Sequence, residues 1–394
     1  MLDRTVYVDN AATTKLDEAV LKDMLPYFTE IYGNPSSLHS TGVEALKVLT
    51  KAREDIAEAL NCEAKEIYFT SGGTEADNWA VRGAAYARMK KGKHIITSAI
   101  EHHAVHHPLK ILEKEGFEVT YLPVYENGIV RVEDVKRLIR DDTILVTIML
   151  ANNEIGTIQP IKEIAEITRE KGILLHTDAV QAVGQIPVDI KDLNVDLMSF
   201  TAHKLYGPKG IGALFIRNGV VINRFMEGGA QERNRRAGTE NIAGAVGFAS
   251  AVKRAVASLE ENSAKLTKMR DRLIKTVLTT IPYTRLNGDA EKRLPGNANF
   301  SIEYIEGESI LLMLDLNKIS ASSGSACTSG SLDPSHVLLA LGLSHEVAHG
   351  SLRISLGHNN TEEDIDYILE VLPKITKTLR NMSPLWEKVE KREN

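Results

Sequence analysis

The chain has 394 residues, a formal net charge of −6 and 43% hydrophobic residues, which is enough for two domains and argues against a nucleic acid as the main partner. No apolar run approaches the roughly 18–20 residues of a membrane span, and the first residues, Met-Leu-Asp-Arg-Thr-Val-Tyr, lack a signal-peptide pattern, so we expect no membrane partner. The two cysteines, Cys62 and Cys327, cannot form a disulfide framework and favour a reducing, cytoplasmic setting.

Apolar strands alternate with helical patterns over the first part of the chain. Strands are predicted at 66–71, 94–98, 118–123, 143–150, 173–177, 195–200 and 212–216. Helical patterns lie between most of them, for example at 43–60 and 161–171. Nearly continuous apolar strands in this alternation are typical of a mainly parallel sheet that is covered on both faces. We therefore predict an α/β fold whose large domain holds a seven-stranded, mainly parallel sheet.

The last part of the chain has a different order of elements. A long helical stretch at about 240–280 is followed by short strands and helices that read as a smaller α+β domain. The strands are predicted at 283–286, 297–302, 319–322 and 352–355, and the helices at 308–316, 334–341 and 361–382. We expect a large domain at 16–260 and a small domain at 261–394. The N-terminal segment 1–15 is expected to pack with the small domain.

Lys204 lies in a setting that suits a lysine bound covalently to pyridoxal phosphate (PLP). It follows the predicted strand 195–200, within the run Ser-Phe-Thr-Ala-His-Lys-Leu-Tyr-Gly-Pro-Lys-Gly-Ile-Gly at 199–212. The strand fixes the base of the lysine, a nearby polar group can orient the phosphate, and the glycines let the backbone pass close to the cofactor. The alternative is a solvated lysine after an edge strand.

Two other segments supply groups that PLP requires. The strand at 173–177 runs into Asp178, whose carboxylate can keep the pyridine nitrogen protonated, although a helix N-cap is the plainer interpretation of this residue. Residues 70–78, Thr-Ser-Gly-Gly-Thr-Glu-Ala-Asp-Asn, place glycines at a strand-to-helix turn, where free N–H groups and the helix dipole favour an anion. Gly73 and Thr74 are the natural phosphate donors, but the same letters also make an ordinary turn.

Together these segments resemble the NifS/IscS-type cysteine desulfurases, which are class V aminotransferase-like enzymes of PLP fold type I. The resemblance spans about residues 7–386. Besides residues 70–78, it rests on Ala-Asn-Asn-Glu-Ile-Gly at 151–156, His-Thr-Asp-Ala-Val-Gln at 176–181, Ser-Phe-Thr-Ala-His-Lys at 199–204 and Ser-Ser-Gly-Ser-Ala-Cys-Thr-Ser at 322–329. The last segment is the mark of the group I branch rather than the SufS-like branch. The resemblance implies that sulfur is removed from L-cysteine to give L-alanine and a persulfide.

Cys327 is the residue that the resemblance assigns to the persulfide. A lone cysteine is usually an inert buried thiol, but this one lies among glycines and small polar residues that offer no apolar shell. The thiolate is the attacking species, so a group must accept the proton of the thiol. The resemblance gives this role to His102, which it also places on the pyridine ring. Cys62 follows a helix and is interpreted as inert.

Further site residues follow from the resemblance. Asn153 would bind the phenolic oxygen of PLP and the substrate carboxylate. Arg353 alternates with apolar neighbours on a strand, and its planar fork suits a carboxylate clamp, although an edge residue would look the same. The remaining cofactor contacts are Gln181, Thr201, His203 and, from a neighbouring subunit, Thr239, which lies after the basic run Arg-Asn-Arg-Arg at 233–236. A homodimer is therefore expected.

Four histidines, at positions 102, 103, 106 and 107, have the i,i+4 spacing of a helical metal site. No second pattern of ligands completes such a site, so we expect no metal. The histidines at 103, 106 and 107 are more simply surface or packing residues.

The expected partners are L-cysteine, a second copy of the chain, and an iron–sulfur scaffold protein or another sulfur acceptor. Two alternatives remain open. One is a selenocysteine lyase or another PLP-dependent lyase or aminotransferase of this fold, although transamination has no use for the cysteine loop. The other is a sulfur-relay scaffold without catalysis, against which the presence of Lys204 and Asp178 argues. The sequence does not distinguish nitrogenase, general iron–sulfur assembly and tRNA thiolation as the destination of the sulfur.

Overall fold

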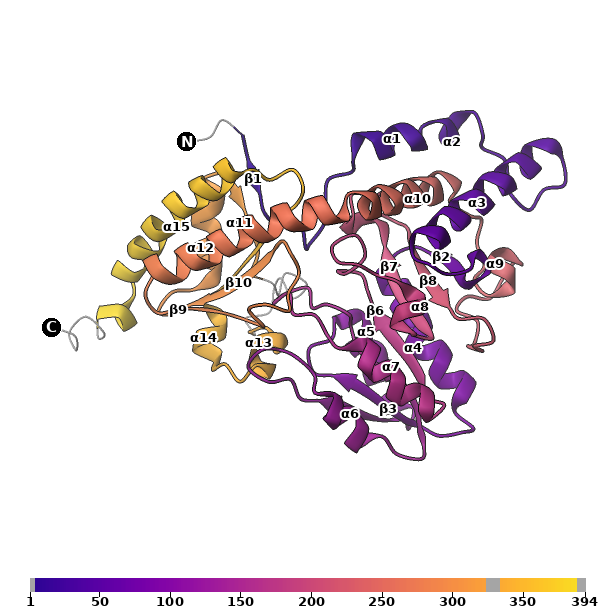
Figure 1. Cartoon of the computed structure of the whole chain (residues 1–394), viewed down its shortest axis with the longest axis horizontal. Coiled ribbons are helices and arrows are strands. Elements are labelled where there is room, and N and C mark those ends of the chain that lie inside the picture. Colours follow the sequence, from indigo (N-terminus) through magenta and orange to yellow (C-terminus); the bar gives the residue numbers. More distant parts are fainter. Residues whose placement is uncertain (1–3, 324–333, 388–394) are drawn as a thin grey trace.

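The computed structural model describes residues 4–323 and 334–387 (Figure 1). Seven strands form its main sheet in the order β2-β8-β7-β6-β5-β3-β4. They are β2 Ile67–Thr70, β3 His94–Ser98, β4 Glu118–Leu122, β5 Thr143–Thr147, β6 Leu174–Asp178, β7 Leu197–Thr201 and β8 Gly212–Ile216. Strand β8 pairs antiparallel with β2 and β7, and the other pairs are parallel. The predicted α/β class with a seven-stranded, mainly parallel sheet is confirmed.

Helices cover both faces of this sheet, which explains why its strands are apolar along their whole length. Helices α4 (Gly73–Arg88) and α5 (His103–Lys114) contribute to the core on one face, where Trp79 is fully buried. Helices α3 (Ser40–Ala59), α7 (Ile161–Glu170) and α10 (Ile242–Ala257) contribute to the core on the other face. Shorter helices lie around them: α1 Glu18–Met24, α2 Pro26–Thr29, α6 Val132–Leu138, α8 Ile190–Leu193 and α9 Gln231–Asn234.

A second, smaller unit has its own hydrophobic core, on the left of Figure 1. Its antiparallel sheet has the order β12-β10-β9, and the short strands β1 and β11 pair in parallel beside it. These strands are β1 Val6–Tyr7, β9 Thr284–Leu286, β10 Asn297–Ile302, β11 Ile319–Ser320 and β12 Ser351–Ser355. Its helices are α11 Leu259–Thr280, α12 Gly307–Leu316, α13 His336–Ala340, α14 His345–His349 and α15 Glu362–Asn381. Because Val6 and Val8 belong to this core, the start of the described chain is tied to its last third.

Several predicted bounds differ from the structure by one to three residues, and two of the differences have a clear structural reason. The single helical stretch at 240–280 is two helices, α10 and α11, bent by 68°. They meet at Ser258, which is the C-cap of α10 and the N-cap of α11 and whose hydroxyl also donates to Arg254 O. The predicted strand 143–150 ends at Thr147, because the N–H of Met149 donates to the carboxylate of Glu101 instead of to a neighbouring strand.

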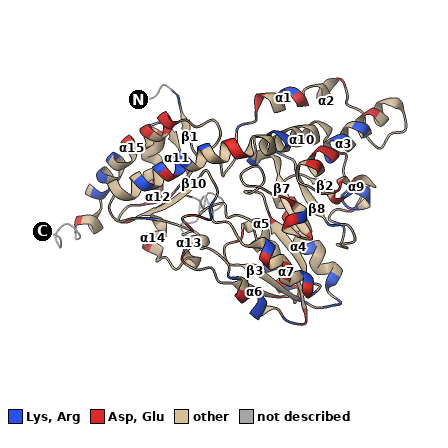
Figure 2. Ribbon diagram, viewed as in Figure 1, with Lys and Arg blue, Asp and Glu red and all other residues tan. Residues whose placement is uncertain are grey.

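Charged side chains gather on the outer turns of the helices, while the inner strands are almost free of them (Figure 2). Within residues 4–323 and 334–387, no single helix is long and apolar enough to cross a membrane. Helices α10 and α11 reach that length and composition only as a bent pair.

Candidate active site

One cavity of about 320 Å³ lies where several strands of the main sheet end. Its walls are formed by Ala11, Ala12, Gly73, Thr74, Asp77, His102, Met149, Asn153, Asp178, Val180, Gln181, Thr201, His203, Lys204 and Arg353. Parallel strands deliver the side chains that follow their carboxyl ends to the same edge of a sheet, which is where α/β proteins bind ligands. The structure thus brings together every predicted site residue that it describes except Thr239.

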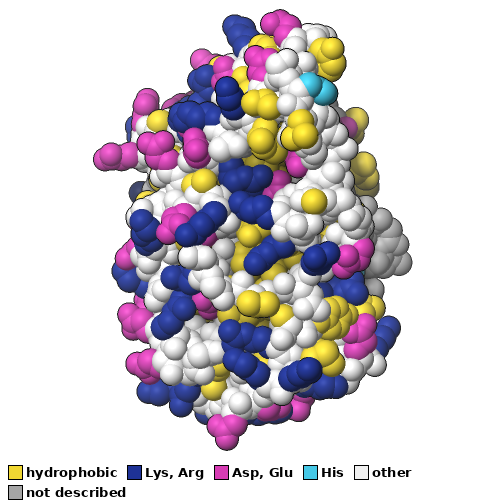
Figure 3. All heavy atoms as spheres, turned by 90° about the vertical axis from the view of Figure 1, so that its right-hand side faces the viewer, with side chains coloured by type: hydrophobic (Ala, Val, Ile, Leu, Met, Phe, Trp, Pro, Cys, Tyr) yellow, Lys and Arg dark blue, Asp and Glu magenta, His cyan; other side chains and the backbone are white. Residues whose placement is uncertain are grey.

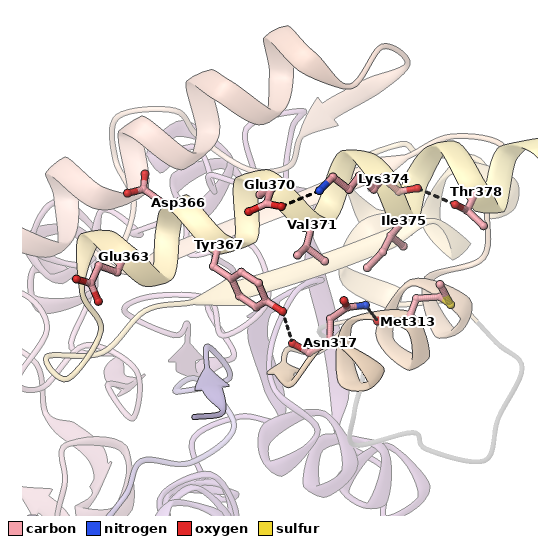
Figure 4. Close-up of a pocket in the computed structure, with 10 residues that line it drawn as sticks. All are labelled: Met313, Asn317, Glu363, Asp366, Tyr367, Glu370, Val371, Lys374, Ile375 and Thr378. Atoms are coloured by element: carbon pink, nitrogen blue, oxygen red, sulfur yellow. Dashed lines mark hydrogen bonds and ion pairs between the residues drawn. The ribbon is translucent and has the colours of Figure 1, made fainter. Parts of the chain in front are cut away.

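A larger cavity, of about 600 Å³, lies between α12 and α15 in the smaller unit (Figure 4). Glu370 pairs with Lys374 on its rim, and Tyr367 donates to the carbonyl oxygen of Asn317. None of the predicted site residues lines it, so size alone does not identify the reactive site. The residues that line the smaller cavity make it the better candidate for the active site.

Lys204 ends the short 3-10 turn Ala202–Lys204 that follows β7. Its Nζ donates to the carbonyl oxygens of Ala11 at 2.6 Å and Ala12 at 2.7 Å, so the N-terminal segment holds this ammonium group at the cavity. The neighbouring Thr201 hydroxyl donates to Ile211 O at 3.0 Å. That hydroxyl must leave Ile211 before it can donate to a phosphate.

Asp178, the last residue of β6, is buried at the cavity wall. Its Oδ1 accepts from the N–H of Val180 at 2.9 Å. Burial raises the pKa of this carboxyl group, while the Val180 N–H and the charge of Lys204 lower it. A cation that entered the cavity beside Asp178 would favour the ionised carboxylate further. This is the environment that a protonated pyridine nitrogen requires.

A second carboxyl group, Asp77 of α4, also lines the cavity and is buried. Its Oδ1 lies 3.6 Å from Nε2 of His176, which in turn bonds the hydroxyl of Ser199 at 3.0 Å. Burial lowers the pKa of His176 to about 3, so its imidazole is neutral. Burial also raises the pKa of Asp77, and the nearby charge of Asp178 adds to this effect. Two acidic groups therefore lie close together at this wall.

The turn from β2 into α4 forms the opposite end of the site. A Cβ atom at Gly73 would lie 2.6 Å from Cγ2 of Val180, so only glycine fits this close approach. The first N–H groups of α4 have no partner within the helix, and the positive end of its dipole favours an anion there. Glu75 in the same turn is paired with Arg236 at 2.7 Å, which leaves the helix start free of an uncompensated negative charge.

His102 is the N-cap of α5, where its Nδ1 accepts from the N–H of Ala104 at 3.1 Å. This bond assigns the hydrogen of the neutral ring to Nε2. Burial, together with the charge of Lys204, lowers the pKa of His102 to about 4. The ring is therefore neutral near pH 7, which is the form that can accept a proton. It would do so at Nδ1, in exchange for the bond from Ala104.

Arg353 and Asn153 form the wall next to the smaller unit. Arg353 belongs to β12, an edge strand of the smaller sheet, yet its side chain is only 3% exposed and turns into the cavity. Its guanidinium donates to the backbone oxygen of Asn153 at 2.9 Å and to Oδ1 of Asp9 at 2.8 Å. Arg353 is thus an edge-strand residue that lines the cavity, and its role as a carboxylate clamp stays a prediction.

The comparisons with known proteins agree with this geometry. The sequence pattern described as "Aminotransferase class-V" matches residues 6–368. A cysteine desulfurase IscS of Clostridium botulinum is 59% identical over 388 residues, which are 98% of this chain and 98% of the relative. The chain belongs to the cysteine desulfurases of the class-V aminotransferase family. Enzymes of this family depend on PLP.

Solved structures of the family show the same architecture. A NifS-like protein has a TM-score of 0.90 and 40% identity, over 95% of this chain and all of that one. SspA, solved in complex with cysteine, has a TM-score of 0.79 and 36% identity, over 89% of this chain and 99% of that one. The family and the PLP fold type I architecture inferred from the motifs are confirmed.

Thr239 lies apart from the other residues that the family resemblance assigns. It is exposed and lines a separate cavity of about 170 Å³ together with Arg236 and Glu240. Its segment follows α9, where Glu232 and Arg233 have positive φ angles of 44° and 56°. A single chain therefore does not bring Thr239 to the Lys204 cavity.

The other histidines of α5 surround His336 of α13. The rings of His103 and His106 each lie 5.0 Å from that of His336, centroid to centroid, and His103 lies 4.9 Å from His107. Within the described part of the chain, no group of three or more His, Cys, Asp or Glu side chains is arranged to hold a metal ion. These imidazole rings pack against one another next to His102, which lines the Lys204 cavity.

Of the two cysteines, Cys62 and Cys327, the structure describes only Cys62. Cys327 lies outside the described residues. Cys62 is partly buried, and burial, with the nearby charge of Glu66, raises the pKa of its thiol to about 12, which disfavours the reactive thiolate.

Sequence reasoning missed five residues of the cavity wall: Ala11, Ala12, Asp77, Met149 and Val180. Asp77 carries the clearest signal, because it comes one helical turn after Gly73 and therefore lies on the same face of α4. Ala11 and Ala12 act through backbone oxygens, so their side chains give no signal of this contact.

Proposed function

We propose that this chain is a PLP-dependent cysteine desulfurase that converts L-cysteine into L-alanine and keeps the sulfur as a persulfide on Cys327. The main support for the proposal is that one cavity is lined by Lys204, Asp178, His102 and Arg353. The chain also belongs to the cysteine desulfurase family. The cysteine bound to the related SspA supports the substrate. Selenocysteine lyase activity and other PLP chemistry of this fold remain the alternatives.

The lining of the cavity fits PLP on three separate features. Asp178 provides a buried carboxylate for the pyridine nitrogen, and Lys204 provides the amine for covalent attachment. Gly73 has no side chain that would crowd Val180, and it lines the cavity with Thr74 at the start of α4, where the phosphate is proposed to bind. The other residues proposed to hold PLP are His102, Asn153, Gln181, Thr201 and His203. When bound, PLP supplies the electron sink for bond cleavage next to the substrate amino group.

The sulfur transfer itself would use Cys327. An S–S bond forms between the thiolate and the substrate sulfur while the bond from that sulfur to Cβ breaks. The electron pair of the broken bond stays with the carbon skeleton, which takes up a proton at Cβ and leaves as alanine. The thiol must first lose its proton. We propose His102 as the acceptor, because its ring is neutral and lies at the cavity.

The substrate carboxylate is proposed to bind Arg353, with the side chain of Asn153 beside it. A guanidinium has five N–H donors in a planar fork that matches a carboxylate. Both residues line the cavity, and Arg353 is fixed by its contacts to Asn153 and Asp9.

The active unit is proposed to be a homodimer in which Thr239 reaches the PLP phosphate of the partner. Hydrophobic side chains and Lys and Arg side chains alternate along the face formed by α2, α3 and α9 (Figure 3). Thr239 is exposed and lies outside the Lys204 cavity of its own chain, which leaves its hydroxyl accessible to a second subunit.

The proposed setting is the cytoplasm, which the scarcity of cysteines favours. The sulfur acceptor is proposed to be an iron–sulfur scaffold protein or another acceptor of persulfide sulfur.

The function is tested by incubating the purified, PLP-loaded protein with L-cysteine and measuring alanine and released sulfide in the presence of a thiol reductant. Equal amounts of both products are expected. Parallel reactions with L-selenocysteine and with L-alanine plus 2-oxoglutarate separate the two alternatives. Faster turnover of L-selenocysteine without persulfide on Cys327, or amino transfer from L-alanine to 2-oxoglutarate, would replace the proposal.

A further inference from the structure

Arg353 is held from one side in a way that leaves part of its guanidinium unused. Nη2 donates to Oδ1 of Asp9, and Nη1 donates to the backbone oxygen of Asn153. Nε is buried and has no hydrogen-bond partner within residues 4–323 and 334–387. Because Nε has almost no accessible surface, a ligand in the cavity would contact the guanidinium through the N–H groups of Nη1 and Nη2 that Asn153 and Asp9 leave unused.

Asp9 is itself fixed by the backbone around it. The segment after β1 folds into a turn, in which the N–H groups of Ala12 and Thr13 both donate to the carbonyl oxygen of Asp9. The hydroxyl of Tyr7 donates to the same oxygen and to that of Thr13. Asp9 also forms a bridge to Ser355 of β12, the strand that carries Arg353. The carboxylate of Asp9 is therefore a fixed partner.

The two partners of the ion pair, Asp9 and Arg353, differ in their exposure to solvent. The Asp9 side chain is 20% exposed, whereas that of Arg353 is 3% exposed, so the pair lies at the edge of the cavity with the guanidinium inside. Arg353 needs only one strong acceptor to keep its charge compensated while the site is empty. Its planar fork has further N–H donors to offer after Asp9 and Asn153 have each taken one.

We propose that Asp9 is a positioning residue for recognition of the substrate carboxylate: its ion pair with Nη2 fixes the guanidinium of Arg353 so that the unused N–H groups of Nη1 and Nη2 are presented to the carboxylate of L-cysteine. This inference rests on the proposed function and extends it to a residue that touches neither substrate nor cofactor. Loss of Asp9 lets the guanidinium rotate away and leaves it without its fixed acceptor. The loss of affinity should then be limited to ligands that have a carboxylate.

The test compares two ligands that differ in this group, L-cysteine and cysteamine. Both are titrated into PLP-loaded protein carrying Cys327→Ala, so that turnover is blocked, and the change in cofactor absorption gives each dissociation constant. Asp9→Ala should weaken L-cysteine by about tenfold or more, which is the range for a hydrogen bond to a charged group. Cysteamine should bind as before. Adding Asp9→Ala to Arg353→Ala should cause no further loss.

Asp17→Asn is the matched control, because it removes one carboxylate from the same N-terminal region and asparagine also caps helix α1. It should leave both dissociation constants unchanged. If Asp9→Ala does not fold, Asp9→Asn keeps the shape and removes only the charge, and Asp9→Glu should restore part of the affinity. Equal weakening of both ligands, or unchanged binding of L-cysteine, overturns the proposal. Failure of the wild-type protein to form alanine refutes the function instead, since the preference for a carboxylate is measured separately.

Discussion

The Nζ atom of Lys204 lies 2.6 Å from the carbonyl oxygen of Ala11, although 193 positions separate the two residues in the sequence. The same N-terminal turn also bonds Gln181 through Ala11 O and His203 through Thr13 Oγ1, and Asp9 pairs with Arg353. A turn of five residues therefore contacts both cationic groups of the site. The hydrogen bonds from Lys204 Nζ to the carbonyl oxygens of Ala11 and Ala12 must break before this nitrogen binds PLP.

Lys204 is expected to carry PLP covalently. Its amine lies at the cavity with Asp178, whereas Lys209 is not among the lining residues. Reduction of the PLP-loaded protein with borohydride, followed by peptide mapping, should place the label on Lys204. Lys204→Ala should lose the covalent label, and Lys209→Ala should keep it. A label on Lys209 in the wild-type protein would end this assignment.

Cys327→Ala is expected to separate substrate binding from sulfur transfer. PLP loading and the spectral response to L-cysteine should be preserved, because neither requires the thiol. Alanine release should fall to background. Cys62→Ala is the control, since the raised pKa of that thiol makes it unreactive, and it should keep full activity. Alanine release at the wild-type rate from Cys327→Ala would show that Cys327 is not the sulfur acceptor.

Replacement of His102 is expected to slow catalysis more than it weakens cofactor binding. A positioned acid or base typically contributes about 10²–10⁴-fold to the rate, so His102→Gln should lower kcat by about 100-fold or more. Glutamine keeps an oxygen that can accept from the N–H of Ala104 and so preserves the cap of α5. His107→Gln, on the exposed side of that helix, should have little effect. Equal losses in both variants would point to damage to α5.

The main sheet could be predicted because its strands are buried on both faces and read as short apolar runs between helical patterns. Residues at the ends of those strands, such as Asp178 and Lys204, could be placed from their position alone. The bend at Ser258 could not, because neither glycine nor proline marks it in the sequence. The end of β5 also depends on a contact with Glu101 that is distant in the sequence.

The parts of the site that are formed by backbone atoms, or by residues far apart in the sequence, were harder to predict. Ala11 and Ala12 contribute carbonyl oxygens, which any residue possesses. The pairing of Asp9 with Arg353 joins two residues that are 344 positions apart. Such contacts depend on the tertiary fold, and no local pattern encodes them. The family resemblance identified Arg353 but not the group that holds it.

His176 is expected to make the fold sensitive to acid. The unfolded chain takes up a proton on this residue near pH 6.5, but burial lowers its pKa in the folded state to about 3. The free energy of unfolding therefore falls as the pH is lowered below 6.5, by about 2 kcal/mol between pH 7 and pH 5 for this one group. His176→Gln should remove that part of the loss. Chemical denaturation at both pH values measures it, with exposed His345→Gln as the control that keeps the full loss.

Thr239 is expected to complete the phosphate site of a partner subunit. It lies outside the Lys204 cavity of its own chain, so Thr239→Ala should weaken PLP binding only through the dimer. Mixed dimers of a Lys204→Ala chain and a Thr239→Ala chain should regain one complete site per pair. PLP loading and alanine formation should then rise to about half of the wild-type values at full exchange into mixed dimers, because one of the two sites has both groups. Normal PLP loading of Thr239→Ala alone, or an active monomer in sedimentation, would contradict the shared site.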